Sequence, residues 1–235
     1  MFSIIIPTLN EEKIISQTIR QFDIVRSKYD IEIIVSDSKS SDNTVEVSKQ
    51  YADKVIIYKT ADNCNIAKAR NNGAKNAIYK NLIFLDADII INDIENFFKK
   101  INNQLSNPAL VSFSPRIVVN PSEQKNIDSI VHAIISSISN IMNTFGFGYS
   151  RGGCQIIKSK YFSMIDGYNE SYAAGEDVDL FRRLRKFGKT SILNSIVVYE
   201  SPRRYRKFGY INILFSWFMN WLYTLIFKKS FSEKW

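Results

Sequence analysis

Short apolar runs alternate with amphipathic stretches along the first hundred residues. The runs FSIII, IEIIV, KVIIY and LIFL have the length and composition of buried strands. Between them, residues 11–25 carry apolar side chains at helical spacing and residues 65–80 are rich in alanine, so both are expected to be helices. A further helix is expected to begin near Asn92 and to lead into the strand ALVSFSP. This alternation predicts an α/β fold with a mainly parallel sheet.

Two apolar helical patterns dominate the second half of the chain. Residues 127–142 place seven aliphatic side chains on one stripe, and His132 beside it is expected to be structural. Residues 210–227 are apolar and aromatic apart from a polar residue at every fourth position, and Lys and Arg flank them. This is typical of a helix that lies in a membrane interface, although packing on the protein's own core is the alternative. The aliphatic stripe of residues 127–142 consists of Ile127, Ile130, Val131, Ile134, Ile135, Ile138 and Ile141.

Polar residues gather where the expected parallel strands end. The carboxyl ends of such strands meet at one edge of the sheet, where α/β proteins bind their ligands. The glycine patterns G-x-G-x-x-G and G-x-x-x-x-G-K-[ST] are absent, so a nucleotide would be held by side chains and its phosphates by a metal ion. The residues are Pro7, Thr8 and Asn10 after the first strand, Asp37 after the second, and Asp86 and Asp88 after the fourth.

Asp86 and Asp88 end the buried run NLIFL with only Ala87 between them. In an extended segment, residues two apart point to the same side, so the two carboxylates can face one spot. Two like charges at that distance repel, and a hard cation such as Mg²⁺ or Mn²⁺ would relieve the repulsion. A turn or a helix cap after a strand is the structural alternative.

Two further segments carry candidate chemistry. GEDVDLFRRLRKFG, residues 175–188, begins with acidic residues and ends with basic residues, which suits the helix dipole. Its Asp177 could cap the helix or act as a general base in a cleft. FGFGYSRGG, residues 145–153, contains four glycines, and this loop could line a substrate channel or form a simple turn.

Composition narrows the class of protein. The chain has 235 residues, and its net charge of +8 and pI near 9.3 indicate an anionic partner: a nucleotide, a nucleic acid or a membrane surface. Cys64, Cys154 and the single His132 form no disulfide framework or zinc motif, which fits a reducing setting. The first residues lack a basic region and a cleavage site, so no signal peptide is expected and a cytoplasmic location follows.

Taken together, six motifs resemble those of the family-two glycosyltransferases, which have the GT-A fold. They are SIIIPTLNEE, IIVSDSKSSDNT, AKARNNGAKNA, FLDAD, GGCQIIKSKYFSMIDGYNE and GEDVDLFRRLRKFG, and they occur in the family's order from Ser3 to about Lys207. The resemblance implies a GT-A domain over residues 1–207, with a nucleotide-sugar half at 1–91 and an acceptor half at 92–207. Residues 208–235 would then form an amphipathic tail.

The resemblance also assigns residues to roles. Asp177 would be the catalytic base, and Gly153 and Glu176 would lie on the acceptor side. Asp88 would bind the metal ion directly, with Asp86 and Glu200 as further ligands. The residues expected at the nucleotide sugar are Pro7, Thr8, Asn10, Glu11, Asp37, Arg70, Asp86, Ala87, Asp88, Arg203 and Arg204.

The sequence departs from the family pattern at three places. Ser38, Lys39 and Asn43 replace the acidic residue and glycines usual after Asp37, which leaves the preferred base open. Glu200 stands near the place where many members have a metal-binding histidine, so this ligand could be Glu200, a water molecule or absent. The Q-x-x-R-W motif of processive polymerases is missing, which argues against processive synthesis.

The resemblance implies an inverting, metal-dependent transfer from a nucleotide-diphosphate sugar. The acceptor would be a glycan or a lipid-linked molecule such as a polyprenyl phosphate, because the basic aromatic tail would bring the site to the cytoplasmic face of a membrane. No nucleic acid is expected as a partner, and a homo-oligomer is possible. The donor sugar and base stay open.

Two other classes of protein compete with this interpretation. A haloacid-dehalogenase-type phosphatase also ends a strand in D-x-D, but there the motif normally opens the domain, whereas here three strand–helix units precede it. A noncatalytic basic module that binds nucleic acid would explain the arginines, but neither the RNA-binding aromatic signature nor a zinc finger is present.

Overall fold

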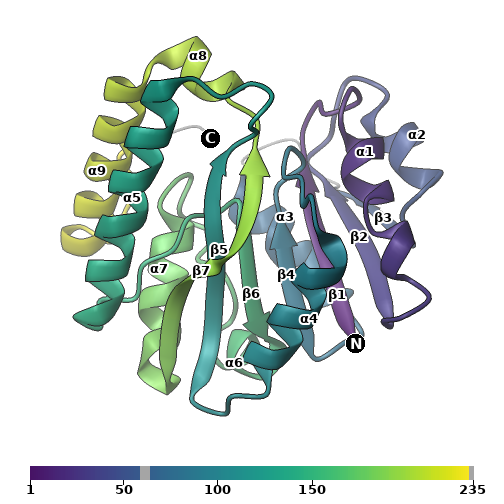
Figure 1. Ribbon diagram of the computed structural model, residues 1–235, viewed down its shortest axis with the longest axis horizontal. Helices are drawn as coiled ribbons and strands as arrows, with labels where there is room; N and C mark the ends of the chain where they lie inside the picture. The colour runs from purple at the N-terminus through teal and green to yellow at the C-terminus, as the bar shows by residue number, and fades with distance from the viewer. Residues whose placement is uncertain (59–63, 233–235) are drawn as a thin grey trace.

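A mixed sheet of seven strands forms the centre of the computed structural model, which describes residues 1–58 and 64–232 (Figure 1). Its strand order is β3-β2-β1-β4-β6-β5-β7. β6 runs antiparallel to both of its neighbours, β4 and β5, while the other pairs are parallel. The mainly parallel α/β sheet is therefore confirmed, and the antiparallel β6 was not anticipated. The strands are β1 Phe2–Thr8, β2 Ile31–Asp37, β3 Lys54–Ile57, β4 Asn81–Leu85, β5 Leu110–Val119, β6 Cys154–Lys158 and β7 Lys189–Glu200.

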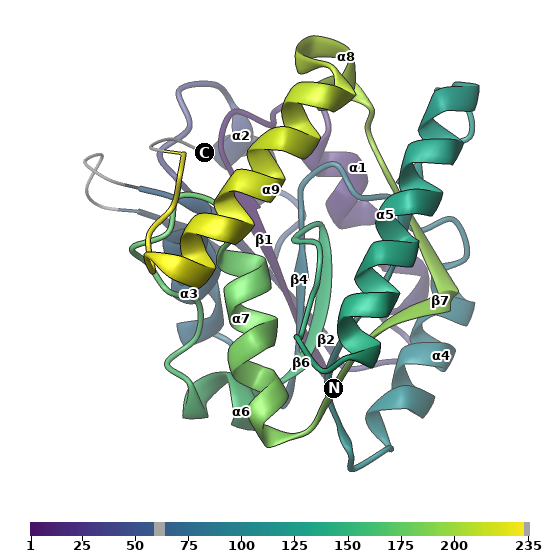
Figure 2. The same ribbon diagram turned by 90° about the vertical axis from the view of Figure 1, so that its left-hand side faces the viewer.

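Helices cover both faces of this sheet (Figures 1 and 2). Alternate residues of β1 enter different clusters of the core: Ile4 and Ile6 pack with Phe98, whereas Ile5 packs with Phe84. A sheet buried on both sides explains why its central strands read as unbroken apolar runs. The helices are α1 Ile15–Arg20, α2 Thr44–Lys49, α3 Ile66–Lys75, α4 Ile94–Leu105, α5 Asn126–Thr144, α6 Ser159–Met164, α7 Glu176–Leu184, α8 Arg203–Phe208 and α9 Tyr210–Ile226, with 3-10 turns at Asp23–Val25 and Arg185–Phe187.

The helix expected over residues 11–25 is wrong in its extent. α1 begins only at Ile15, because backbone N–H groups upstream bond to the segment that follows β2: Glu11 donates to the hydroxyl of Thr44, the first residue of α2, at 2.8 Å, and Glu12 donates to the Asp42 carboxylate at 3.2 Å. The helix expected over residues 65–80 likewise ends early, at Lys75. Beyond it, the backbone N–H of Ile78 bonds instead to Glu32 at 2.6 Å.

α5 and α9 turn apolar side chains outward. An amphipathic helix normally packs its apolar stripe on the core, yet Ile130, Ile134 and Ile138 of α5 are exposed while its Asp128 and His132 are buried. α9 shows the same inversion, because its polar Asn220 and Thr224 are buried while apolar positions such as Phe215 face outward. Figure 2 shows both helices on the same face of the molecule. Within the described residues, no helix is both long and apolar enough to cross a bilayer.

The segment after residue 207 contacts the rest of the protein at several points. Ile213 is buried with Val119 and Tyr205 in a small cluster. The Ser230 hydroxyl and the backbone of Ala174 are joined by two hydrogen bonds of 3.0 and 3.2 Å, so the chain beyond α9 is tied to the loop before α7. The boundary expected after residue 207 stays a prediction, and the last part of that segment, residues 233–235, lies outside the described residues.

Candidate active site

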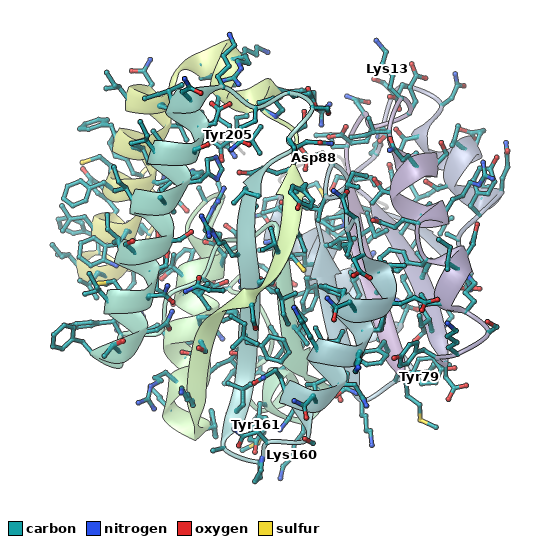
Figure 3. The ribbon with its side chains drawn as sticks, viewed as in Figure 1. Lys13, Tyr79, Asp88, Lys160, Tyr161 and Tyr205 are labelled. Carbon is teal, nitrogen blue, oxygen red and sulfur yellow. The ribbon has the colours of Figure 1, made fainter. Side chains whose placement is uncertain are left out.

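A cavity of about 200 Å³ lies beyond the end of β4, where the loop before β6, the start of α7 and the inner side of α9 meet. Figure 3 places Asp88 at the edge of the sheet below α8, on the same side as Tyr205 and at the opposite end from Tyr79 and Tyr161. The cavity brings together eight residues that were assigned to the site: Arg70, Asp86, Asp88, Gly153, Glu176, Asp177, Glu200 and Arg204.

Arg70 of α3 connects the two acidic motifs. Its side chain is 1% exposed and donates to Glu176 at 2.8 Å, to Asp86 at 2.7 Å and to the Gly152 carbonyl at 3.0 Å. These partners raise the pKa of the guanidinium further above its ordinary value against the effect of burial, so Arg70 is always charged. Arg70 therefore holds Asp86, at the end of β4, in a fixed position relative to the start of α7.

Asp88 lies among more negative than positive charge. Its side chain is 28% exposed, and the nearest cation is Arg203, whose guanidinium is 3.5 Å from the carboxylate. Burial, followed by the negative charges of Asp86 and Glu200, raises the pKa of Asp88 to about 7, while Arg203 opposes this shift. An added cation would relieve this repulsion, so Asp88 has the chemistry of a ligand for a divalent metal ion.

The three carboxylates expected to share a metal ion are not gathered into one cluster. Across residues 1–58 and 64–232, no group of three His, Cys, Asp or Glu side chains is arranged to hold a metal ion. Glu200 is instead engaged by the Arg151 guanidinium at 2.6 Å and the Tyr205 hydroxyl at 2.7 Å. Mg²⁺ and Mn²⁺ sites in nucleotide enzymes often use one or two carboxylates plus substrate phosphates, and Asp88 with Asp86 behind it fits that arrangement.

The start of α7 directs two carboxylates into the cavity. Gly175 precedes them in the left-handed region with φ +82°, a conformation that glycine adopts at low cost. Burial raises the pKa of Asp177, while the charge of Arg70 opposes this shift. A Cβ atom at Gly152 would lie 3.4 Å from the Asp177 carboxylate and 3.0 Å from the Arg70 guanidinium, so the glycine turn packs closely against both. A proton acceptor at this place faces the same cavity as Asp88.

The other assigned residues lie outside the cavity lining. Asn10 and Asp37 order the loop after β2, because Asn10 accepts from the backbone N–H of Ser41 at 2.8 Å and Asp37 from that of Ser40 at 2.9 Å. Thr8 is buried and its hydroxyl has no hydrogen-bond partner. Glu11 pairs with Arg203 at 3.1 Å. The residues that do not line the cavity are Pro7, Thr8, Asn10, Glu11, Asp37, Ala87 and Arg203.

Several lining residues were missed by the sequence reasoning. Tyr149 and Arg151 come from the glycine-rich loop, which therefore borders the cavity, while its role in a substrate channel stays a prediction. Trp217, Asn220 and Trp221 come from α9, which was treated only as a tail. The sequence pattern places Asn220 on the polar side of the helix and the two tryptophans on its apolar side, and only the fold shows that all three border the cavity.

The mixed, mainly parallel sheet flanked by helices is the GT-A fold of solved glycosyltransferases. The sequence matches glycosyl transferase family 2 over residues 3–164, so the chain belongs to that family and is a glycosyltransferase. It is 29% identical over 192 residues to the poly-beta-1,6-N-acetyl-D-glucosamine synthase of Staphylococcus epidermidis, a match that covers 79% of this chain and 46% of the synthase. The chain thus spans less than half the length of that relative.

Solved structures share the fold at low sequence identity. A mannosyltransferase from Pyrobaculum calidifontis in complex with GDP-Man and Mn²⁺ superimposes with a TM-score of 0.68 at 17% identity, covering 85% of this chain and 56% of the other. A second match is the glucosyl-3-phosphoglycerate synthase of Mycobacterium tuberculosis in complex with Mn²⁺, UDP and glucosyl-3-phosphoglycerate. Its TM-score is 0.62 at 16% identity, and the match covers 97% of this chain and 79% of the synthase. Both likenesses support the GT-A architecture.

Proposed function

We propose that this enzyme transfers a sugar from a nucleoside-diphosphate sugar to an acceptor oxygen, with inversion and with a divalent cation. The observation that carries the proposal is the position of Asp88, a carboxylate with excess negative charge around it, in the same cavity as Asp177. Bound at Asp88, Mg²⁺ or Mn²⁺ would supply positive charge to the leaving diphosphate. Glycosyltransferase structures that contain Mn²⁺ with GDP-Man or UDP support this choice of cation and donor.

Protein side chains then perform the remaining tasks. Asp177 takes the proton from the acceptor hydroxyl, and its position beside Arg70 keeps it at the cavity wall. Arg204 faces the cavity and is placed to pair with a phosphate, while Arg203 closes over Asp88 from α8. The resemblance implied that Arg70 contacts the nucleotide; because its side chain is 1% exposed and bonds to Asp86 and Glu176, we propose instead that Arg70 positions these two acids.

We further propose a lipid-linked acceptor, with the C-terminal helix bringing the enzyme to the cytoplasmic face of a membrane. Support comes from the exposed apolar side chains of α9 and the basic residues at its ends. If the acceptor is a polyprenyl phosphate, the attacking oxygen is already ionised and Asp177 contributes less to the rate. General-base assistance to a neutral hydroxyl is worth about 10² to 10⁴-fold.

The comparisons give glycosyltransferases and no support to a phosphatase, and one oxygen of Asp86 is already engaged by Arg70 at 2.7 Å. The nucleic-acid alternative finds no support in the comparisons, which give glycosyltransferases.

Replacement of Asp88 tests the proposed function. A panel of UDP-, GDP- and other sugar nucleotides is expected to raise the melting temperature of the wild-type protein only with Mn²⁺ or Mg²⁺ present. Asp88→Asn should abolish this metal-dependent shift and donor turnover, while the free variant stays folded because it loses a repelled charge. Asp23→Asn, whose side chain is 56% exposed and remote from the cavity, is the matched control. Turnover of Asp88→Asn at the wild-type rate would refute the assignment.

A further inference from the structure

α5 presents an outward face that an ordinary solvated helix would not have. Its exposed isoleucines Ile127, Ile130, Ile134, Ile138 and Ile141 are each 49–57% exposed. Residues 126–147 contain a single charged residue, Asp128, and that residue is buried and paired with Arg206. A helix face of this length with no exposed charge, and with isoleucine at helical spacing, has the composition of a face that another apolar surface covers.

α9 extends the same apolar surface. Tyr210 at its start donates to Asp128 of α5 at 2.7 Å, so the two helices meet at one end, and both lie on the face turned toward the viewer in Figure 2. In Figure 1 that face lies at the left edge of the molecule, away from the sheet. The exposed apolar residues of α9 and its flanks are Phe208, Ile211, Phe215, Phe218, Leu225, Ile226 and Phe227, and Phe145 and Phe147 follow α5.

The charge at the rim of this surface has one sign. Residues 203–232 contain six Lys or Arg residues and no Asp or Glu. Arg203 and Arg206 pair with acids of the protein and Arg204 lines the cavity, but among the described residues Lys207, Lys228 and Lys229 form no ion pair. In a two-fold dimer that pairs α9 with its antiparallel copy, the basic start of one helix would lie against the basic end of the other, and the two would repel. Anionic lipid headgroups would pair with them instead.

We propose that α5 and α9 together form a docking face for an anionic lipid bilayer, in which both helices lie in the interface plane. This extends the membrane association proposed above from the tail to α5, and it does not depend on sugar transfer. Trp217 and Trp221 of α9 line the cavity from the flank of the helix, between its buried Asn220 and its exposed Phe218, whose ring centroid lies 6.0 Å from that of Trp221. Docking therefore places the cavity next to the headgroup layer, where a lipid-linked acceptor carries its reactive group.

Vesicle sedimentation of the full chain tests the α5 contribution. Wild-type protein is expected to sediment with vesicles of phosphatidylcholine and phosphatidylglycerol, and less with phosphatidylcholine alone or at high salt. The triple variant Ile130→Ser, Ile134→Ser, Ile138→Ser should bind at least about tenfold more weakly, because it removes most of the apolar area of α5. The matched control is Ile24→Ser with Ile78→Ser, which removes isoleucines that are 63% and 69% exposed on other elements.

A labelled variant keeps the proposal testable if the triple variant fails to fold. Ser137 is exposed between Ile134 and Ile138, so a polarity-sensitive dye on Ser137→Cys in a Cys64→Ser background should shift to the blue when anionic vesicles are added. The same dye at Ser106, an exposed residue after α4, should not respond. Metal-dependent binding of sugar nucleotides, measured in parallel, reports separately on the transferase site.

Two outcomes would overturn the proposal. The first is wild-type vesicle binding by the triple variant together with an unresponsive dye at residue 137. The second is a protein that ignores vesicles but forms a dimer by light scattering, with the α5 substitutions returning it to a monomer. The latter result would identify a second copy of the chain as the occupant of this face.

Discussion

Arg70 shows how one residue can organise an acidic site. It is the only side chain of α3 that contacts both Asp86 and Glu176 among the described residues, and these acids come from elements far apart in the sequence. A buried charge that loses its partner costs far more than an exposed pair gains. The stability of the protein and the geometry of its cavity therefore depend on the same guanidinium.

Replacing Arg70 should cost stability as well as activity. In Arg70→Met, Asp86 and Glu176 lose their buried cation, so we expect the free energy of unfolding to fall by about 3–5 kcal/mol. Arg20→Met is the control, because the Arg20 pair with Asp23 is exposed at 3.9 Å and should be worth less than about 1 kcal/mol. Urea denaturation measures the free energy of unfolding of both variants. Equal losses in the two would contradict the conclusion that Arg70 holds Asp86 and Glu176 together.

At the scale of elements, a buried carboxylate joins α5 to the C-terminal helices. Asp128 is fully buried and pairs with Arg206 of α8 and with the Tyr210 hydroxyl of α9. The hydrogen bonds from Arg206 hold the pKa of Asp128 well below its ordinary value, although burial acts in the opposite direction. Asp128 thus ties α5 to α8 and α9, and the strength of these contacts depends on whether its carboxyl is ionised.

The Asp128 pair predicts a pH-dependent stability difference. A carboxylate whose pKa is lowered by folding stabilises the protein above its unfolded pKa, about 3.9, and loses this contribution as the pH falls toward the folded pKa. Asp128→Asn should therefore lower the free energy of unfolding by about 1–3 kcal/mol at pH 7. The difference from wild type should shrink below about pH 4. Thermal melts from pH 7 to pH 3 measure the stability difference between wild type and Asp128→Asn. A difference that stays constant with pH would contradict the role of the ionised Asp128 carboxylate.

The turn before α7 carries a second prediction for an element. Gly175 has φ +82°, and a Cβ atom there would lie 3.1 Å from Thr224 of α9. Gly175→Ala should cost about 1–2 kcal/mol of stability from the left-handed backbone and should also lower the rate, because Glu176 and Asp177 follow directly. Gly146→Ala, at φ +80° and outside the cavity lining, should lose comparable stability but keep its rate. Unchanged kinetics of Gly175→Ala would contradict this coupling.

At the scale of the whole molecule, α9 belongs both to the cavity and to the outer surface. The sequence predicted its apolar, aromatic character and its basic flanks, which argued for an anchor. In the fold, Trp217, Asn220 and Trp221 line the cavity while Phe215 and Phe218 face outward. Removal of the segment would therefore remove one wall of the cavity as well as any membrane contact.

A truncated chain separates these two roles. Residues 1–207 should keep metal-dependent binding of sugar nucleotides, because Asp88 and Arg70 lie outside the deleted part, but transfer to an acceptor should fall at least about tenfold with the loss of the cavity wall. Trp221→Ala, which removes one cavity-lining side chain of α9, should show part of the same loss of transfer. Radiolabelled sugar nucleotide, with membrane extract as acceptor, measures donor hydrolysis and sugar transfer separately. The two rates distinguish a loss of donor use from a loss of transfer. Full sugar transfer by the truncated chain would contradict the claim that transfer needs the cavity wall formed by α9.

The sequence predicted the central strands and the acids at their ends because these features are local. Continuous apolar runs identify β1, β2 and β4, and the D-x-D motif directly follows one of them. The pairing of Arg70 with Glu176, 106 residues away, and of Arg151 with Glu200, 49 residues away, depends on chain packing that no local pattern encodes. For the same reason periodicity identified the stripe of α5 but not the direction in which it faces.

The place of β6 in the sheet has a consequence for synthesis on the ribosome. β4 pairs with β1 on one side and with β6 on the other. During synthesis the second edge of this wholly buried strand stays unpaired until β6, which ends at residue 158, has left the ribosome. Unpaired apolar edges recruit other chains. A fragment that stops at residue 91 should therefore form inclusion bodies, and the nascent protein should need a chaperone until the second half of the chain has been made.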